Sequence, residues 1–496
     1  MTPSPFPILI IAVPLITAFL VIPLGWLKRS LCYPLMILSL SLSTLSALVI
    51  LIHLLSDGTL HYRLGGWPPP WGIEYVIDHL NAFVALIVSV ISLLIGISSK
   101  EMVQKDFPEK TVFFYSLFLL QVTGLLGIVV TGDLFNLYVF LEIASIAGYA
   151  LIAIGEDGAP FASFNYMIYG TIGACFYLLG VGYLYIATGS LNMTDLTQLL
   201  PSLTSSKVVL LAFAFFVVGI AIKMALFPLH VWLPDAYTYA PSVVSSLVAP
   251  LTTKVGAYVL IRILLHLFPH SFFIETIPAA LLLRWVAGIA VIFGCILALA
   301  QTDLKRMLGY VLIAEIGYIG LGIGLGNRNG LIGAILHILN DGLMMACLFL
   351  IVGAITFKGW PRKMNLLTGI HRKMPLTMAT LVISGLSVIG IPPTCGFFSK
   401  WYLVLGAIDS KQWLSVAILL ASSLFNAILF FRVIEKAYFE PARDEHESED
   451  RSIEMDGVPF TILIPLFILT AGILSVGLLS GKIISGIIQH AIPAGF

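Results

Sequence analysis

The sequence predicts an all-α integral membrane protein with about fourteen membrane-spanning helices. Of its 496 residues, 59% are hydrophobic and only 10% are charged, whereas a soluble chain is about a quarter charged. The chain also divides into long apolar stretches that are separated by short polar segments or by proline and glycine. Because one span needs about 20 apolar residues, this length leaves room for about fourteen of them.

Each predicted span is an apolar run bounded by charged residues or by proline and glycine. In chain order the predicted spans are 5–26, 31–55, 80–98, 112–130, 133–153, 161–187, 206–230, 243–265, 277–300, 304–325, 330–357, 375–408, 412–437 and 458–480. Two of these spans look broken, the seventh at Pro228 and the twelfth at Pro392 and Pro393. Proline lacks an amide N–H and clashes with the preceding turn, so we expect both helices to be broken there.

The positions of the two broken spans predict the internal organisation of the chain. They lie five spans apart, and broken helices at matching positions are typical of inverted repeats. We therefore expect a three-helix segment at 1–111 and two five-helix units of opposite orientation at 112–265 and 266–440. The remaining segment, 441–496, would hold an acidic loop and a last helix.

The distribution of basic residues predicts the orientation. If the N-terminus is extracytoplasmic, most lysines and arginines fall in cytoplasmic loops, among them Lys28, Lys105, Lys305 and Arg306, whereas Arg262 falls outside. This bias satisfies the positive-inside rule. Both termini are then expected on the outer face of a bacterial or archaeal cell membrane.

With basic residues at the span ends assigned to the loops, three lysines remain deep within the predicted spans: Lys223, Lys254 and Lys400. A charge at the centre of a span costs roughly 2.5–3.5 kcal/mol on insertion scales, so it normally faces a partner or a wet cavity. Two interpretations follow: ion pairs that hold helices together, or a proton pathway. The spread of the lysines over three spans favours the pathway.

A carboxylate, Glu142, lies in a span neighbouring that of Lys223 and could form a pair with it. Such a pair stabilises both charges. Separating it would favour proton release by the lysine, whose charged form is disfavoured in a low-dielectric site, and proton uptake by the glutamate. Lys254, on the following span, could accept the proton laterally.

A second group of ionisable residues lies further along the chain. His337 and Asp341 are four residues apart, so they share one helix face, and a histidine can both donate and accept a proton near neutral pH. Glu315 has two open interpretations, membership of the relay or pairing with Lys305 or Arg306. His230 and Asp235 flank the broken seventh span, where they could gate proton uptake or simply be solvated at a helix end.

No redox or hydrolytic chemistry is visible in the sequence. The five cysteines lie far apart in apolar segments, without the paired spacing of a metal site, and we interpret them as packing residues. The sequence predicts no cofactor, no metal and no nucleic-acid partner.

Several long motifs resemble the antiporter-like subunits shared by Mrp-type Na+/H+ antiporters, membrane-bound hydrogenases and respiratory complex I, most closely the Mrp D subunit. The motifs are DLFNLYVFLEI, YLYIATGSLNMTDL, KMALFPLHVWLPDAYTYAPSVVSSLVAPLTTKVGAYVLIR, QTDLKRMLGY and PPTCGFFSKWYL. The resemblance covers about residues 75 to 440. It implies fourteen helices, inverted five-helix units, broken helices seven and twelve, and proton transfer along a central hydrophilic axis.

Carried over residue by residue, the resemblance implies proton-transfer roles for Glu142, Lys223, Lys254, His337 and Lys400. In two places the sequence departs from some relatives, because Met345 stands where they have a lysine and Asn165 where they have a basic residue. The central relay is therefore expected to depend more on His337 and Asp341.

The resulting hypothesis is a proton-translocating subunit of a multi-subunit membrane complex, with an Mrp-type cation/proton antiporter as the favoured assembly. The alternatives are the proton-pumping arm of a hydrogenase or NADH dehydrogenase-like complex, and a structural spacer that has lost transport. The expected partners are other membrane subunits, protons, sodium ions in the antiporter case, and lipid.

Overall fold

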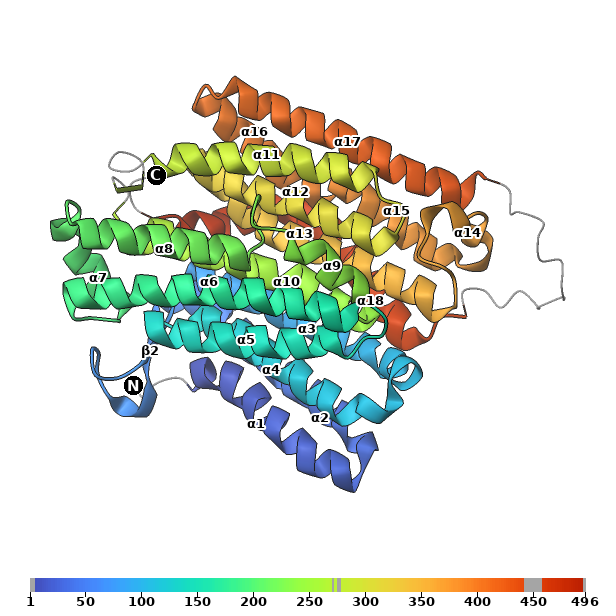
Figure 1. The fold of residues 1–496 in the computed structure, drawn as a ribbon, viewed down its shortest axis with the longest axis horizontal. Helices are drawn as coiled ribbons and strands as arrows, with labels where there is room; N and C mark the ends of the chain where they lie inside the picture. The colour runs from blue at the N-terminus through green and yellow to red at the C-terminus, as the bar shows by residue number, and fades with distance from the viewer. Residues whose placement is uncertain (1–4, 270–271, 274–277, 441–456, 494–496) are drawn as a thin grey trace.

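The structure, a computed structural model, describes residues 5–269, 272–273, 278–440 and 457–493. Its long helices lie side by side, roughly along one direction, in one bundle (Figure 1). Within these residues, twelve helices are long and apolar enough to cross a membrane. They are α1 (Phe6–Leu27), α2 (Cys32–Asp57), α3 (His79–Asp106), α4 (Thr111–Val130), α5 (Leu134–Ala153), α6 (Ala159–Thr188), α10 (Ser242–Ile261), α11 (Ala279–Leu299), α12 (Leu304–Gly324), α13 (Arg328–Phe357), α17 (Trp413–Tyr438) and α18 (Phe460–Gly486). These helices coincide with twelve of the predicted spans, which confirms the all-α membrane fold.

The other two predicted spans are each interrupted, as the prolines indicated. The first consists of α8 (Lys207–Lys223) and α9 (Trp232–Tyr239), and the second of α15 (Pro375–Ile389) and α16 (Cys395–Asp409). Both α8 and α9 pack on α6, so the chain continues past residue 230, where the sequence analysis wrongly ended this span. The count of fourteen spans and the inverted repeats stay predictions.

A small β-hairpin, which the sequence analysis missed, closes one end of the bundle. Strands β1 (Leu60–Arg63) and β2 (Glu74–Ile77) pair antiparallel. Asp78 then caps α3 and forms an ion pair with Arg262, with 2.6 Å between Oδ2 and the guanidinium. Burial alone would raise the pKa of Asp78, but Arg262 and a backbone amide donor hold it below its usual range. We call this end of the molecule the hairpin end.

The remaining elements are short. They are helices α7 (Met193–Leu199) and α14 (Ile370–Lys373), the 3-10 turns Arg29–Leu31, Leu64–Gly66, Pro108–Lys110, Leu200–Leu203, Met364–Leu366 and Ile488–Ala491, and a π-helical turn at Arg262–Leu267.

The bundle has a buried centre and an apolar outer surface. Helices α12 and α13 are buried along almost their entire length, whereas only about a third of α1 and of α17 is buried. The exposed side chains are large and apolar, for example Phe19 on α1 and Leu424 on α17. Exposed apolar surface of this extent is stable against lipid but not against water, which places the molecule in a membrane.

Both ends of the described chain lie at the hairpin end. Helix α1 begins there and α18 ends there (Figure 1), and the ring of His490, just after α18, lies 5.1 Å from that of His79 at the start of α3. The two ends of the described chain are therefore on the same side of the bundle. The predicted acidic loop at 444–450 lies outside the described residues.

Two sequence interpretations are corrected by burial. Lys305, predicted in a cytoplasmic loop, is inside α12 with only 2% of its surface exposed. Cys175, predicted as a packing residue, is exposed on α6, whereas the other four cysteines are buried. Lys305 lies two residues after Asp303, which caps the helix. Because its neighbours in sequence are charged, the sequence analysis placed it in a loop.

Close helix packing fixes the break between α15 and α16. A Cβ atom built on Gly477 of α18 would lie 2.0 Å from the carbonyl oxygen of Pro393, whereas one on Gly481 meets nothing within 4 Å. Backbone cannot yield as a flexible side chain does, so Gly477→Ala is expected to cost about 1–3 kcal/mol of stability. The thermal midpoint of the purified protein should fall for Gly477→Ala and not for Gly481→Ala. Equal midpoints would show that α18 does not hold the break.

Candidate functional site

The first part of the site is a charge pair where α8 ends. Lys223 is the last residue of α8, and its Nζ lies 3.3 Å from Oε1 of Glu142 on α5. The same ammonium donates to the Ser145 hydroxyl at 2.7 Å. Lys223 is buried, whereas a quarter of the Glu142 side chain is exposed. The pair expected from the sequence is therefore present, and its carboxylate faces outward.

A small cavity lies next to this pair. Its volume is about 30 Å³, and its polar lining comes from Ser145, Tyr166, Lys223 and Thr252. A cavity that holds a water molecule needs roughly 10–15 Å³ and polar partners, so about two waters fit here. The cavity therefore lies between Lys223 and the part of α10 that carries Lys254.

The second part is a fully buried ion pair between α10 and α13. Nζ of Lys254 lies 2.5 Å from Oδ2 of Asp341, and the two side chains are 2% and 0% exposed. Lys254 also donates to Thr253 Oγ1 and to the carbonyl of Ala249, both at 3.3 Å. The sequence placed Asp341 beside His337 on one helix face, and the structure shows that its charged partner comes from another helix.

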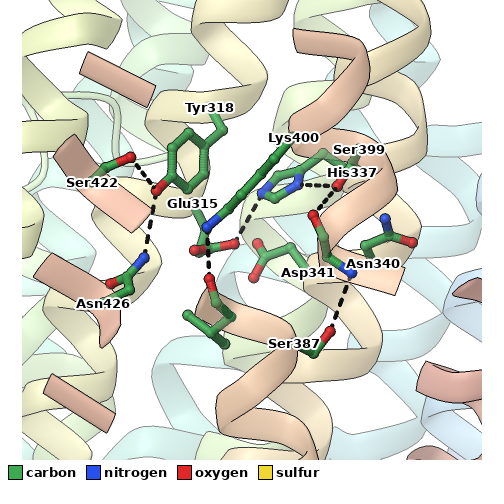
Figure 2. Close-up of polar contacts among 12 residues, drawn as sticks. Glu315, Tyr318, His337, Asn340, Asp341, Ser387, Ser399, Lys400, Ser422 and Asn426 are labelled. Atoms are coloured by element: carbon green, nitrogen blue, oxygen red, sulfur yellow. Dashed lines mark hydrogen bonds and ion pairs between the residues drawn. The ribbon is translucent and has the colours of Figure 1, made fainter. Parts of the chain in front are cut away.

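The third part joins α12, α13 and α16. Nε2 of His337 lies 3.0 Å from Oε2 of Glu315, and both side chains are fully buried. On its other side, Nδ1 of His337 is 2.9 Å from the Ser399 hydroxyl (Figure 2). Of the two interpretations of Glu315, the structure supports the first, because Lys305 donates to the Ala240 carbonyl and Arg306 pairs with Asp235.

Lys400 follows the second break and ends the line of buried charges. Its Nζ donates to the Val388 carbonyl at 2.6 Å and lies 4.6 Å from the ring centroid of Tyr318. The Tyr318 hydroxyl in turn donates to Ser422 at 2.8 Å, and Figure 2 shows these groups beside Glu315 and His337. Within the described residues Lys400 has no carboxylate at ion-pair distance, unlike Lys223 and Lys254.

The sequence places Thr252 and Thr253 next to Lys254, but sequence reasoning missed the other neutral partners: Ser145, Tyr318, Ser399 and Ser422. Most of them stand close in sequence to an ionisable residue inside an apolar span, as Ser145 follows Glu142 and Tyr318 follows Glu315 by three positions. Such spacing puts two side chains on neighbouring positions of one helix face. This pattern could have identified them.

The two residues proposed as gates lie apart from this line. The His230 ring stacks on Phe227 and meets the edge of Phe293. Asp235 pairs with Arg306 at 3.2 Å, and both side chains are about 40% exposed. The structure therefore supports helix-end solvation for Asp235 and aromatic packing for His230. In the described part of the chain, no three His, Cys, Asp or Glu side chains are placed to hold a metal ion.

The bundle and its line of buried charges define a polytopic membrane protein of the ion-translocating class. Residues 131–426, more than half of the chain, match the family model described as NADH:quinone oxidoreductase/Mrp antiporter, TM. The chain belongs to this family, as its motifs indicated.

Named relatives extend the match to most of the chain. The NADH-quinone oxidoreductase N subunit of Desulforudis audaxviator is 46% identical over 438 residues, with 87% of each chain covered. The Na(+)/H(+) antiporter D subunit of Alkalihalophilus pseudofirmus is 30% identical over 428 residues, with 86% of this chain and 85% of the other covered. A chain of an archaeal membrane-bound sulfane sulfur reductase superposes with a TM-score of 0.89 at 32% identity, covering 98% of this chain and 97% of that one.

Proposed function

We propose that this chain is a proton-translocating, antiporter-like subunit of a multi-subunit membrane complex. The observation that carries the proposal is the line of three pairs of ionisable side chains inside apolar helices: Glu142–Lys223, Lys254–Asp341 and Glu315–His337. Ionisable groups are costly inside a membrane, and they normally mark a pathway for ions or protons. Lys400 at the second break is the end of that line.

The pairs act as proton-exchange steps. While a pair is closed, each charge stabilises the other. When it opens, the low-dielectric surroundings favour the neutral lysine and the neutral carboxylic acid, so a proton leaves the first and reaches the second. Protons enter near Glu142 and Lys223, cross the small cavity to Lys254, pass His337 and leave through Lys400.

The assembly and its energy source have two candidates. An Mrp-type cation/proton antiporter would use an ion gradient, with sodium as the second ion. A redox complex is favoured by the higher identity to an NADH-quinone oxidoreductase subunit, 46% against 30% for the antiporter protein. Purification from the native membrane in mild detergent distinguishes them: co-purifying subunits with iron, nickel or flavin identify a redox pump, and metal-free membrane partners an antiporter.

The orientation and the repeats also belong to this proposal. Helix α1 ends opposite the hairpin (Figure 1), and Lys28 caps that end, while Lys105 is in the last turn of α3 and Arg362 pairs with Asp303, which caps the start of α12. By the positive-inside rule these basic residues make that end cytoplasmic. Both termini then face outward. The two interrupted spans, each with a buried lysine next to the break, support two inverted five-helix units.

Lys223→Ala tests the proton pathway directly. The substitution removes the group that exchanges protons with Glu142 and borders the cavity, so proton movement should fall to background while the complex stays assembled. The measurement is dye-monitored pH change in sealed vesicles that contain the intact complex, with assembly followed on native gels.

Lys207→Ala is the matched control, because Lys207 begins the same helix α8 but lies exposed at its end. It should transport as the native protein does. Unchanged proton movement by an intact complex with Lys223→Ala would overturn the pathway and leave the structural spacer as the better interpretation.

A further inference from the structure

A fourth buried lysine, Lys305, has no role in the line of charges described above. It is the second residue of α12, its side chain is 2% exposed, and its Nζ donates to the carbonyl of Ala240 at 2.8 Å. Among the described residues, none of the ion pairs includes it. Burying an ammonium group without a carboxylate partner is costly. The single hydrogen bond to the Ala240 carbonyl does not explain why Lys305 is buried.

Lys305 lies on the wall of a polar cavity of about 580 Å³ at the end of the bundle opposite the hairpin. We call this cavity the vestibule. Its other ionisable lining residues are Asp106, Glu109, Lys110, Glu156 and Arg362. All but Arg362 are exposed, so the mouth of the vestibule is in contact with water while Lys305 is not. Three of these side chains are carboxylates, and with Lys305 three are cationic, so the lining is balanced in charge.

Hydroxyl groups continue from the vestibule into the membrane along the contact between α10 and α13. Ser242 and Thr356 both line the vestibule, and their hydroxyl oxygens are 3.1 Å apart. One turn further along α10, Ser246 is buried, and Pro250 has no amide N–H to donate to the Ser246 carbonyl. The carbonyl of Ala249 then accepts from Lys254.

Helix α13 has a glycine opposite each end of this stretch of α10. A Cβ built on Gly353 would lie 3.4 Å from Ser242 Cβ, and one on Gly342 would lie 3.8 Å from the Pro250 carbonyl. At these two positions α13 therefore places no side chain over Ser242 or the Pro250 carbonyl. From Ser242 to Lys254 the polar groups follow about 18 Å of helix, and they end at the Lys254–Asp341 pair.

We propose that Lys305 loads protons from the vestibule and passes them along this polar α10–α13 contact to Lys254. In one cycle the Lys305 ammonium gives a proton to water beside Ser242 and is protonated again from water in the vestibule. The proton that moves inward finally protonates the Asp341 carboxylate or the free amine of Lys254. This inference rests on the proposed function and adds a second loading step, at a site separate from Glu142 and Lys223. Both sites load in the same cycle, so the loss of either one stops transport.

Two substitutions at Lys305 separate a proton-loading role from a fixed positive charge. Arginine keeps the charge and the donor to Ala240 but does not release its proton, and glutamine keeps a donor without the charge. Both Lys305→Arg and Lys305→Gln are expected to lower proton movement by about ten-fold or more in vesicles with the intact complex. Lys363→Gln, which changes an exposed lysine at the same end, should transport normally.

The native complex and Lys223→Ala are measured in the same experiment. If the native complex moves protons and Lys223→Ala does not, the proposed function stands whatever the Lys305 variants show. If an assembled Lys305→Arg or Lys305→Gln complex then moves protons at the native rate, the proton-loading role of Lys305 is overturned and the proposed function is not.

A chemical block of the vestibule tests the same proposal when a Lys305 variant does not assemble. Glu109→Cys places an exposed thiol at the mouth, and a bulky, membrane-impermeant maleimide applied from that side should slow proton movement several-fold. The parent protein, which keeps the exposed Cys175, controls for labelling elsewhere. Native rates after complete labelling of Glu109→Cys would overturn uptake through the vestibule.

Discussion

Asp341→Leu is expected to destabilise the protein by about 3–5 kcal/mol, because it leaves the Lys254 ammonium buried without a carboxylate. The two side chains are 2.5 Å apart and almost completely buried, and the other contacts of Lys254 are the neutral Thr253 hydroxyl and the Ala249 carbonyl. Less folded protein should accumulate in the membrane, and its thermal midpoint in detergent should fall below that of every other variant named here.

The double variant Lys254→Met/Asp341→Leu separates stability from transport. With both charges removed, apolar side chains of similar size fill the site, and buried ion pairs replaced in this way often lose no stability. We therefore expect the thermal midpoint to recover while proton movement stays at background. A single variant as stable as the native protein, or a double variant no more stable than the single one, would contradict the ion-pair account.

Hydropathy and proline position predicted most of the fold because they report local properties. A run of apolar residues forms a spanning helix regardless of its neighbours, and Pro228, Pro392 and Pro393 remove backbone donors wherever they stand. The length of the first interrupted span escaped prediction because it depends on tertiary contacts. Trp232, just past the break, donates its indole N–H to the Ile222 carbonyl and stacks on Tyr166 of α6, which returns the chain to a helical path through Tyr239.

In the site, too, the sequence predicted features within one helix but not the contacts between helices. The spacing of His337 and Asp341 put both on one face of α13, and the structure agrees, but the spacing carried no information about which helix faces them. The partner of Asp341 is 87 positions away on α10, and that of His337 is on α12. Lys305 is the plainest failure, since its burial results from a contact with Ala240, 65 residues earlier in the chain.

His337→Gln is expected to lower proton movement by about 100-fold or more with little loss of assembled complex. Glutamine can keep a hydrogen bond to Ser399, which lies 2.9 Å from Nδ1 of the native ring. It cannot take up and release a proton near neutral pH, as imidazole does. Because His337 stands between the Lys254–Asp341 pair and Lys400, its loss divides the pathway into two halves.

Glu315→Gln and the double variant Glu315→Gln/His337→Gln, measured beside His337→Gln, decide whether Glu315 and His337 act in one proton-transfer step. If the proton passes through the Glu315–His337 contact, each single variant should stop it, and the double variant should be no slower than either. His371→Gln is the control, because that ring lies outside the line of charges, packed on Tyr438 with Nδ1 2.8 Å from the Ala437 carbonyl. Native proton movement in an assembled His337→Gln complex would mean that protons reach Lys400 without the imidazole, through water beside Glu315.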